Sequence, residues 1–253
     1  MKKGAFIAVI ILTFLAAAGA LYQASQSLDR YIPWNFLVSE WTRAAFTILF
    51  GIALIIHFIR NMPRFIMLLS GAAVFSFINE FVIGHMYALF LITAGVVTAV
   101  SELKRHGKME KAAVNPAKSG ILTATGVLAG VFAVYYTIFN AVTIDMTRFF
   151  GSADLLTAVT TAVSLAGIAV FCFLKSKRNS VYYRLFFAGQ LLLNVLLGPT
   201  RLLLNIELDT MVWEYSLYVL GCTALLALVL VDAVRNSLGE RNTSEPQTDT
   251  VIS

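Results

Sequence analysis

Residues 119–140, SGILTATGVLAGVFAVYYTIFN, contain no charged side chain and are long enough to cross a lipid bilayer as a helix. A hydrocarbon core of about 30 Å requires roughly 20 mainly apolar residues in helical conformation. Seven other blocks of similar character occur along the chain, separated by short polar segments. The eight blocks cover residues 4–22, 43–59, 65–80, 86–101, 119–140, 154–174, 182–205 and 212–234. We therefore predict an all-α, polytopic integral membrane protein with about eight transmembrane helices.

The composition supports this fold class. Hydrophobic residues make up 58% of the chain and charged residues 13%, with a mean hydropathy of +0.79, whereas soluble domains contain about 25% charged residues. The block at 65–80 is short, so we expect it to be tilted or buried within the protein. The lipid bilayer is the expected partner. The net charge of +5 reflects membrane topology and predicts no nucleic acid partner.

The distribution of lysine and arginine predicts the orientation of the helices. With eight helices both termini lie on one side of the membrane, and 15 of the 19 basic residues fall on that side. The exceptions are Arg30, Arg43, Arg148 and Arg201. Because basic residues concentrate in cytoplasmic loops, we predict a plasma (inner) membrane protein with cytoplasmic N- and C-termini.

The N-terminus also has features of a secretory signal peptide. Lys2 and Lys3 precede an apolar run that ends at Ala18-Gly19-Ala20, a small-residue sequence typical of cleavage sites. Cleavage would leave seven helices and an external N-terminus. The apolar run is longer than the usual core of about 7 to 15 residues, which favours retention as a membrane helix.

A weak internal repeat relates the two halves of the chain. At an offset of 115 or 116, residues 51–53 (GIA) match 167–169, Asp29 matches Asp145, and Asn79 matches Asn194. Each half would contain four helices, so the halves would share one orientation about an axis along the membrane normal. The expected division is a first half at 1–103, a basic cytoplasmic linker at 104–118, a second half at 119–234 and a disordered cytoplasmic tail at 235–253.

Polar residues inside apolar blocks are the candidates for function, because a polar group in hydrocarbon needs a partner. The seventh block contains four of them within roughly 60° around a helix, namely Gln190, Asn194, Arg201 and Asn205. Gly198-Pro199 lies within this stripe and predicts a kink or break. The corresponding interruption in the first half is Gly84-His85, directly after Asn79-Glu80.

Two interpretations of this stripe remain open. In the first, an outward-facing pocket binds a solute through Asn79, Glu80, His85, Gln190, Asn194, Arg201 and Asn205, with Tyr135, Asn140 and Glu214 as further candidates. In the second, Arg201 extends to the outer headgroups and the asparagines tie helices together. We also expect His57, at the inner boundary, to be structural.

Several kinds of chemistry are disfavoured by the sequence. It contains no His-Glu-x-x-His, Gly-x-Ser-x-Gly or Cys-x-x-Cys motif, and its three histidines are dispersed. We therefore expect no metal site and no cofactor, and a non-enzymatic protein is favoured. Cys172 and Cys222 are predicted at different depths, which argues against a disulfide between them.

Three functions are compatible with these features. The leading prediction is a carrier or channel-like protein for a small polar or anionic solute. The alternative is a non-transporting membrane sensor, accessory or immunity subunit whose polar stripe binds a membrane-protein partner. A third option is an intramembrane lipid-modifying enzyme that uses Glu80 and His85 as acid and base.

Overall fold

The computed structural model describes residues 3–28, 34–82, 85–106, 119–143, 153–174, 180–207 and 212–244, and the regular structure within these ranges is entirely α-helical. A helix covers each predicted apolar block, which confirms the all-α class. The described helices are α1 (Lys3–Leu28), α2 (Trp34–Arg60), α3 (Pro63–Val82), α4 (Tyr87–His106), α5 (Ser119–Thr143), α6 (Ala153–Phe173), α7 (Ser180–Glu207) and α8 (Val212–Ser244).

Five described helices are long and apolar enough to cross a membrane. They contain the segments Gly4–Gln26, Glu40–Arg60, Tyr87–Arg105, Gly120–Ile138 and Ser216–Arg235. Two shorter apolar segments lie in α3 (Pro63–Phe75) and α6 (Ala158–Phe173). The prediction of eight complete spans is therefore supported in part, at the level of several long apolar helices.

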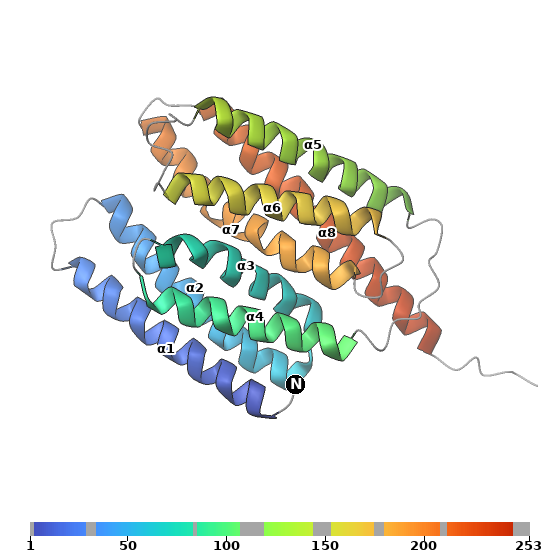
Figure 1. The fold of residues 1–253 in the computed structure, drawn as a ribbon, viewed down its shortest axis with the longest axis horizontal. Coiled ribbons are helices and arrows are strands. Elements are labelled where there is room, and N and C mark those ends of the chain that lie inside the picture. The colour runs from blue at the N-terminus through green and yellow to red at the C-terminus, as the bar shows by residue number, and fades with distance from the viewer. Residues whose placement is uncertain are drawn as a thin grey trace, which may run out of the picture.

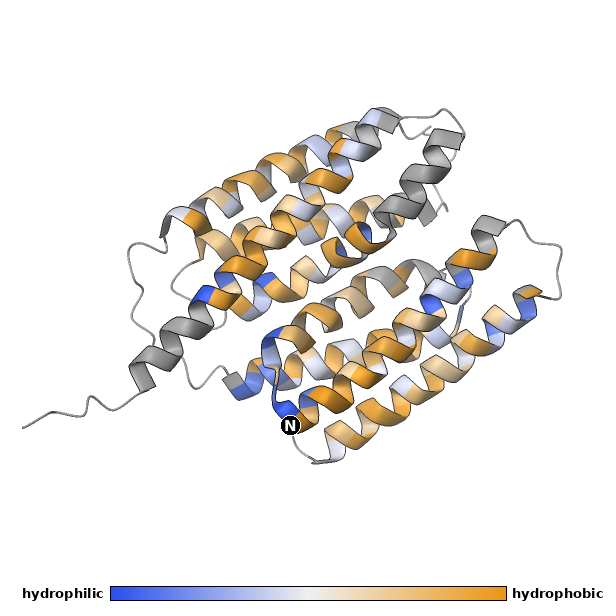
Figure 2. Cartoon of the chain, turned by 180° about the vertical axis from the view of Figure 1, so that it is seen from behind, coloured by the Kyte–Doolittle hydropathy of each residue, from blue (hydrophilic) through white to orange (hydrophobic). Residues whose placement is uncertain are grey.

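Large apolar side chains cover the outside of the bundle. Phe14 on α1 is 72% exposed, Ile59 on α2 is 74% exposed, and Val131 on α5 is 62% exposed. Figure 2 shows hydrophobic residues along most of the described helices, with hydrophilic residues grouped mainly near the helix ends. Soluble monomeric proteins rarely expose so large an apolar surface to water, so this exterior is suited to contact with lipid.

The eight helices form two groups of four that meet along α3 and α7 (Figure 1). Within the first group, α1 packs against α2 and α4, and α3 packs against α4. Within the second, α5 packs against α6 and α8, and α7 packs against α6 and α8. The start of α1 and the end of α8 lie at the same end of the bundle (Figure 1), as expected for an even number of alternating helices.

Helix α3 is the central element of the bundle. Every residue from Ile66 to Ala73 is buried, and α3 supplies side chains to the hydrophobic cores of both groups: Leu69 and Phe77 to the first, Met67 and Leu68 to the second. This placement explains why its apolar segment is short. Residues 66–73 are buried within the protein, in agreement with the expectation for residues 65–80.

The crossing of α3 and α7 depends on two glycines. A Cβ atom at Gly71 would lie 1.7 Å from the Phe186 carbonyl oxygen, and one at Gly189 would lie 2.1 Å from the Ala72 nitrogen and 2.4 Å from the Leu68 carbonyl oxygen. These atoms belong to the backbone and cannot rotate away. Glycine at both positions therefore allows the two helix backbones to approach each other, as small residues do at helix interfaces in membranes.

Two helix ends and the interior of a third helix differ from the predictions. Helix α4 continues to His106, three residues into the linker expected at 104–118, and Glu102, which follows the predicted block at 86–101, lies in this helix and is buried. Helix α8 continues to Ser244, ten residues into the segment expected to be disordered. Helix α7 continues through Gly198 and Pro199, and the expected break is absent there. Proline removes only one backbone donor, and the rest of a long helix can continue around it.

Candidate functional site

The middle of α7 contributes two buried polar side chains to the second group of helices. Asn194 is 7% exposed, and its Nδ2 donates a hydrogen bond to the hydroxyl oxygen of Tyr218 on α8 at 2.6 Å. Gln190 is 4% exposed, and its Nε2 donates a long hydrogen bond of 3.4 Å to Thr161 Oγ1 on α6. The two side chains are one turn apart, so α7 is hydrogen-bonded to both α6 and α8 in its middle part.

Tyr218 is the centre of this cluster. Its side chain also makes hydrogen bonds with Thr161 and Cys222, and its ring stacks on Tyr136 of α5 with a centroid separation of 4.9 Å. All four helices of the second group therefore contribute to one set of polar and aromatic side chains, of which Tyr136 is partly buried. We call Tyr136, Thr161, Gln190, Asn194, Tyr218 and Cys222 the α5–α8 polar cluster. It is uncharged and rich in hydrogen-bonding groups.

His85 lies in the other half of the molecule, in the connection between α3 and α4. Its Nε2 accepts a hydrogen bond from Gln23 Nε2 on α1 at 2.5 Å, and its ring stacks on that of Tyr87. These contacts are with the first group of helices. Gln190 and Asn194 thus meet in the second group, whereas His85 contacts Gln23 and Tyr87 in the first.

The remaining candidates lie on α3, α5, α7 and α8. Asn79 and Glu80 are in α3, and Arg201 and Asn205 are in α7, but their side chains lie outside the described set, as do those of Asn140 and Glu214. Tyr135 on α5 is 41% exposed. A pocket that combines all seven predicted residues therefore stays a prediction.

A buried ion pair that sequence reasoning missed lies near the end of the second group at which α7 begins. Arg184 on α7 is 2% exposed, and its Nη2 donates to Asp232 Oδ2 on α8 at 2.5 Å. Its Nη1 donates to the Phe171 carbonyl oxygen on α6 at 3.0 Å. Counting basic residues placed Arg184 at the membrane surface. Asp232 offered a signal, because an acid inside an apolar block suggests a buried partner.

A second buried pair lies in the first group, near the ends of α2 and α4. His57 Nε2 on α2 is 3.2 Å from Glu102 Oε1 on α4, and the two residues are 5% and 0% exposed. His57 thus makes a contact between helices, and its partner is the buried carboxylate of Glu102. Glu102 escaped notice because it stands at the start of a run of basic residues.

Metal and disulfide chemistry find no support in the described part of the chain. Within it, no group of three His, Cys, Asp or Glu side chains could hold a metal ion. Cys172 and Cys222 are both buried and both free. The α5–α8 polar cluster and the two buried pairs can take part in hydrogen bonding, ion pairing and proton exchange.

Comparisons with protein families, with curated proteins and with solved structures find no significant match to this chain. The class of protein therefore follows from the fold itself. The long apolar helices and the apolar exterior are consistent with a multi-pass membrane protein.

Proposed function

We propose that the chain crosses the plasma membrane eight times as two parallel four-helix halves. Corresponding helix pairs pack in both halves, with α3 on α4 matched by α7 on α8. The central crossing supports the same relation. Gly71 approaches Phe186, and Gly189 approaches Leu68. Gly189 lies 118 positions after Gly71, and Phe186 lies 118 positions after Leu68, so the two contacts are equivalent. Reciprocal contacts of this kind are characteristic of an interface with two-fold symmetry.

The orientation that we propose places both termini in the cytoplasm and can be tested by labelling. Reporter fusions or single cysteines near residues 30, 148 and 208 should be accessible from outside, and those near 108 and 245 from inside, because basic residues are retained on the cytoplasmic side. A cytoplasmic label at residue 148 would contradict the eight-span topology.

We further propose that the protein is a carrier or channel-like protein for a small polar solute. The observation that supports this function best is the α5–α8 polar cluster, since polar groups that lie inside a membrane are costly and commonly mark a substrate path. The described cluster offers amide, hydroxyl and aromatic groups without a charge, which suits an uncharged polar solute. Selectivity for an anion would depend on Arg201.

The alternative function is a non-transporting sensor or accessory subunit. One observation favours it: the amides of Gln190 and Asn194 are buried and bonded to Thr161 and Tyr218 of the same chain. Bonds between helices of this type can serve only to stabilise the bundle. In a carrier, by contrast, the same groups must exchange these partners for water or solute during the transport cycle.

Solvent access to Asn194 separates the two functions. In a background with Cys172 and Cys222 replaced by alanine, we expect Asn194→Cys to react with a small, charged, membrane-impermeant thiol reagent in proteoliposomes. The matched control is Leu196→Cys, whose native side chain is 59% exposed on the lipid-facing exterior. A charged reagent does not enter hydrocarbon, so position 194 should react at least about tenfold faster than position 196.

Two outcomes would contradict the carrier function. If positions 194 and 196 are equally unreactive from both sides of the membrane, the cluster is not hydrated and the accessory function is favoured. If both react equally, the reagent is reaching unfolded protein. Retention of the thermal transition of the parent protein in both cysteine variants excludes that explanation.

A further inference from the structure

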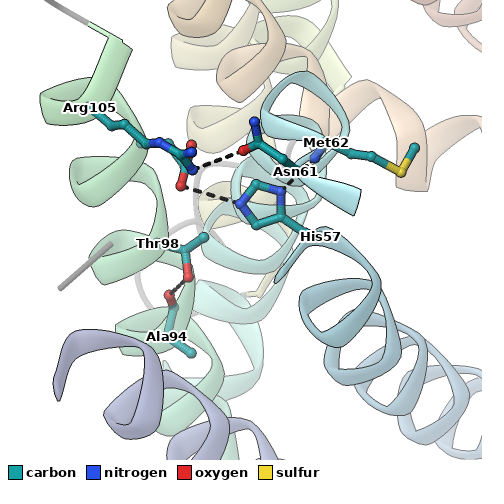
Figure 3. A network of polar contacts seen from close by, with 7 residues as sticks. His57, Asn61, Met62, Ala94, Thr98 and Arg105 are labelled. Carbon is teal, nitrogen blue, oxygen red and sulfur yellow. Dashed lines mark hydrogen bonds and ion pairs between the residues drawn. The ribbon is translucent and has the colours of Figure 1, made fainter. Parts of the chain in front are cut away.

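The inner end of the first half contains a hydrogen-bonded chain through both nitrogens of one imidazole ring (Figure 3). Nδ1 of His57 accepts a hydrogen bond from the backbone N–H of Met62 at 2.9 Å. Nε2 of the same ring lies 3.2 Å from Glu102 Oε1. His57 thus joins the connection between α2 and α3 to helix α4.

These two contacts determine where the ring proton is. A nitrogen that accepts a hydrogen bond carries no proton, so Nδ1 must be bare and the proton must reside on Nε2, where it points to the Glu102 carboxylate. A doubly protonated imidazolium has a donor at both nitrogens. It would direct an N–H group at the N–H of Met62, and that contact could not persist.

We propose that His57 and Glu102 form a proton-binding site, and that proton uptake there releases the connection between α2 and α3. The proton would bind to Nδ1 of His57. The link from Nε2 to Glu102 would then become an ion pair and strengthen, while the Met62 N–H would lose its acceptor and turn to water. Binding of one proton therefore breaks the hydrogen bond between the Met62 N–H and His57 and strengthens the contact between His57 and Glu102 on α4.

The surroundings of the ring are suited to this exchange. Arg60 on α2, Arg64 on α3, and Lys104 and Arg105 on α4 are the other charged groups with described side chains at this end of the first half, and all are basic, so Glu102 is the acidic group that faces the ring. On α1, the nearby Phe6 stacks on Phe58 and cannot titrate. The ring is buried, but Asn61 and Met62 are exposed, which gives water a route to the site.

The turn between α2 and α3 is held by several contacts. Asn61 has a φ of 51°, in the left-handed region that asparagine adopts more readily than most residues other than glycine. Arg105 Nη1 donates to Asn61 Oδ1 at 2.8 Å (Figure 3), the Asn61 N–H donates to the His57 carbonyl oxygen at 2.6 Å, and the bond from the Met62 N–H to the His57 ring is the contact that protonation would remove. Because α3 begins directly after this turn and crosses α7 at Gly71, loosening the turn would act on the element that joins the two halves.

The test uses the full-length protein in nanodiscs with ¹⁵N-labelled histidine. At about pH 8, NMR should find Nδ1 of His57 unprotonated and Nε2 protonated. At about pH 5 both nitrogens should be protonated, and the hydrogen-exchange protection factor of the Met62 amide should fall at least about tenfold, because the amide has lost its acceptor.

Two variants separate a proton site from a merely structural contact. His57→Asn places an amide oxygen near the position of Nδ1 but cannot take up a proton, so Met62 protection should become independent of pH. Glu102→Gln keeps an acceptor for Nε2–H but removes the charge, so the ring should resist protonation and Met62 should stay protected at about pH 5. Lys104→Gln, which removes an exposed charge from the same helix, should leave the response unchanged.

Several results would overturn the proposal. A His57 ring that carries its proton on Nδ1 at about pH 8 would contradict the hydrogen-bond geometry. So would a Met62 amide whose protection is the same at both pH values although the ring has been protonated. If His57→Asn fails to fold, the spectra of the wild-type protein and Glu102→Gln still decide the question. None of these readouts depends on whether the protein transports a solute.

Discussion

Gly71→Ala and Gly189→Ala should each prevent the normal packing of the two halves and sharply reduce the amount of folded protein. A methyl group at Gly71 would lie 1.7 Å from the Phe186 carbonyl oxygen, and one at Gly189 would lie 2.1 Å from the Ala72 nitrogen. Inserting a methylene among side chains typically costs about 1 to 3 kcal/mol. Here the obstacle is backbone, so α3 and α7 must separate and we expect a cost at or above that range.

The measurement is thermal unfolding in mild detergent, together with the monodisperse fraction after size-exclusion chromatography. Gly130→Ala on α5 is the matched control, because a Cβ there meets no atom within 4 Å. Alanine favours helix over glycine by about 1 kcal/mol, so this variant should be as stable as the wild type or slightly more stable. Equal behaviour of Gly189→Ala and Gly130→Ala would show that the halves do not meet at this crossing.

Neutralising either member of the Arg184–Asp232 pair should destabilise the protein strongly, and neutralising both should restore most of the loss. Arg184 and Asp232 are almost completely buried and 2.5 Å apart. Removing one partner of such a pair strands the other charge at a cost of about 3 to 5 kcal/mol, whereas an apolar replacement of both is often tolerated. We therefore expect Asp232→Leu and Arg184→Met to unfold readily, and the double variant to be much more stable than either.

A double-mutant cycle in detergent quantifies this coupling. The control is the partly exposed pair of Arg43 and Glu40, which lie three residues apart on α2 at 2.6 Å and whose side chains are 29% and 13% exposed. Partly hydrated pairs contribute about 0 to 1 kcal/mol, so Glu40→Gln should change stability little. Additive effects of Asp232→Leu and Arg184→Met would indicate that the two side chains do not form a pair in the membrane.

The polar residues of the candidate site illustrate how far sequence reasoning reached. The helical period placed Gln190 and Asn194 on one face of α7, and both are buried in one cluster with residues of α5, α6 and α8. The identity of their partners, Thr161 and Tyr218, could not be read from that period. Helical periodicity describes a single helix, and it carries no information on which neighbour faces a given side or at what depth.

The buried pairs were missed for a related reason. Arg184 and Glu102 each stand near the end of an apolar block, where a charged side chain usually extends to the headgroups. Whether it does so or turns inward depends on a partner at the same depth on another helix, here Asp232 and His57. That information is non-local, and a count of basic residues along the chain does not contain it.

The sequence by itself determined that the protein is built of long apolar helices and where along the chain those helices lie, because the cost of exposing backbone and apolar groups depends on each local stretch of residues. Only the tertiary structure decided that α3 and α7 are central, that Gly71 and Gly189 allow them to touch, and which buried polar groups are paired. Those outcomes depend on contacts between residues far apart in the sequence, from 24 positions for Asn194 and Tyr218 to more than one hundred at the crossing of α3 and α7, where shape and charge must be complementary across different helices.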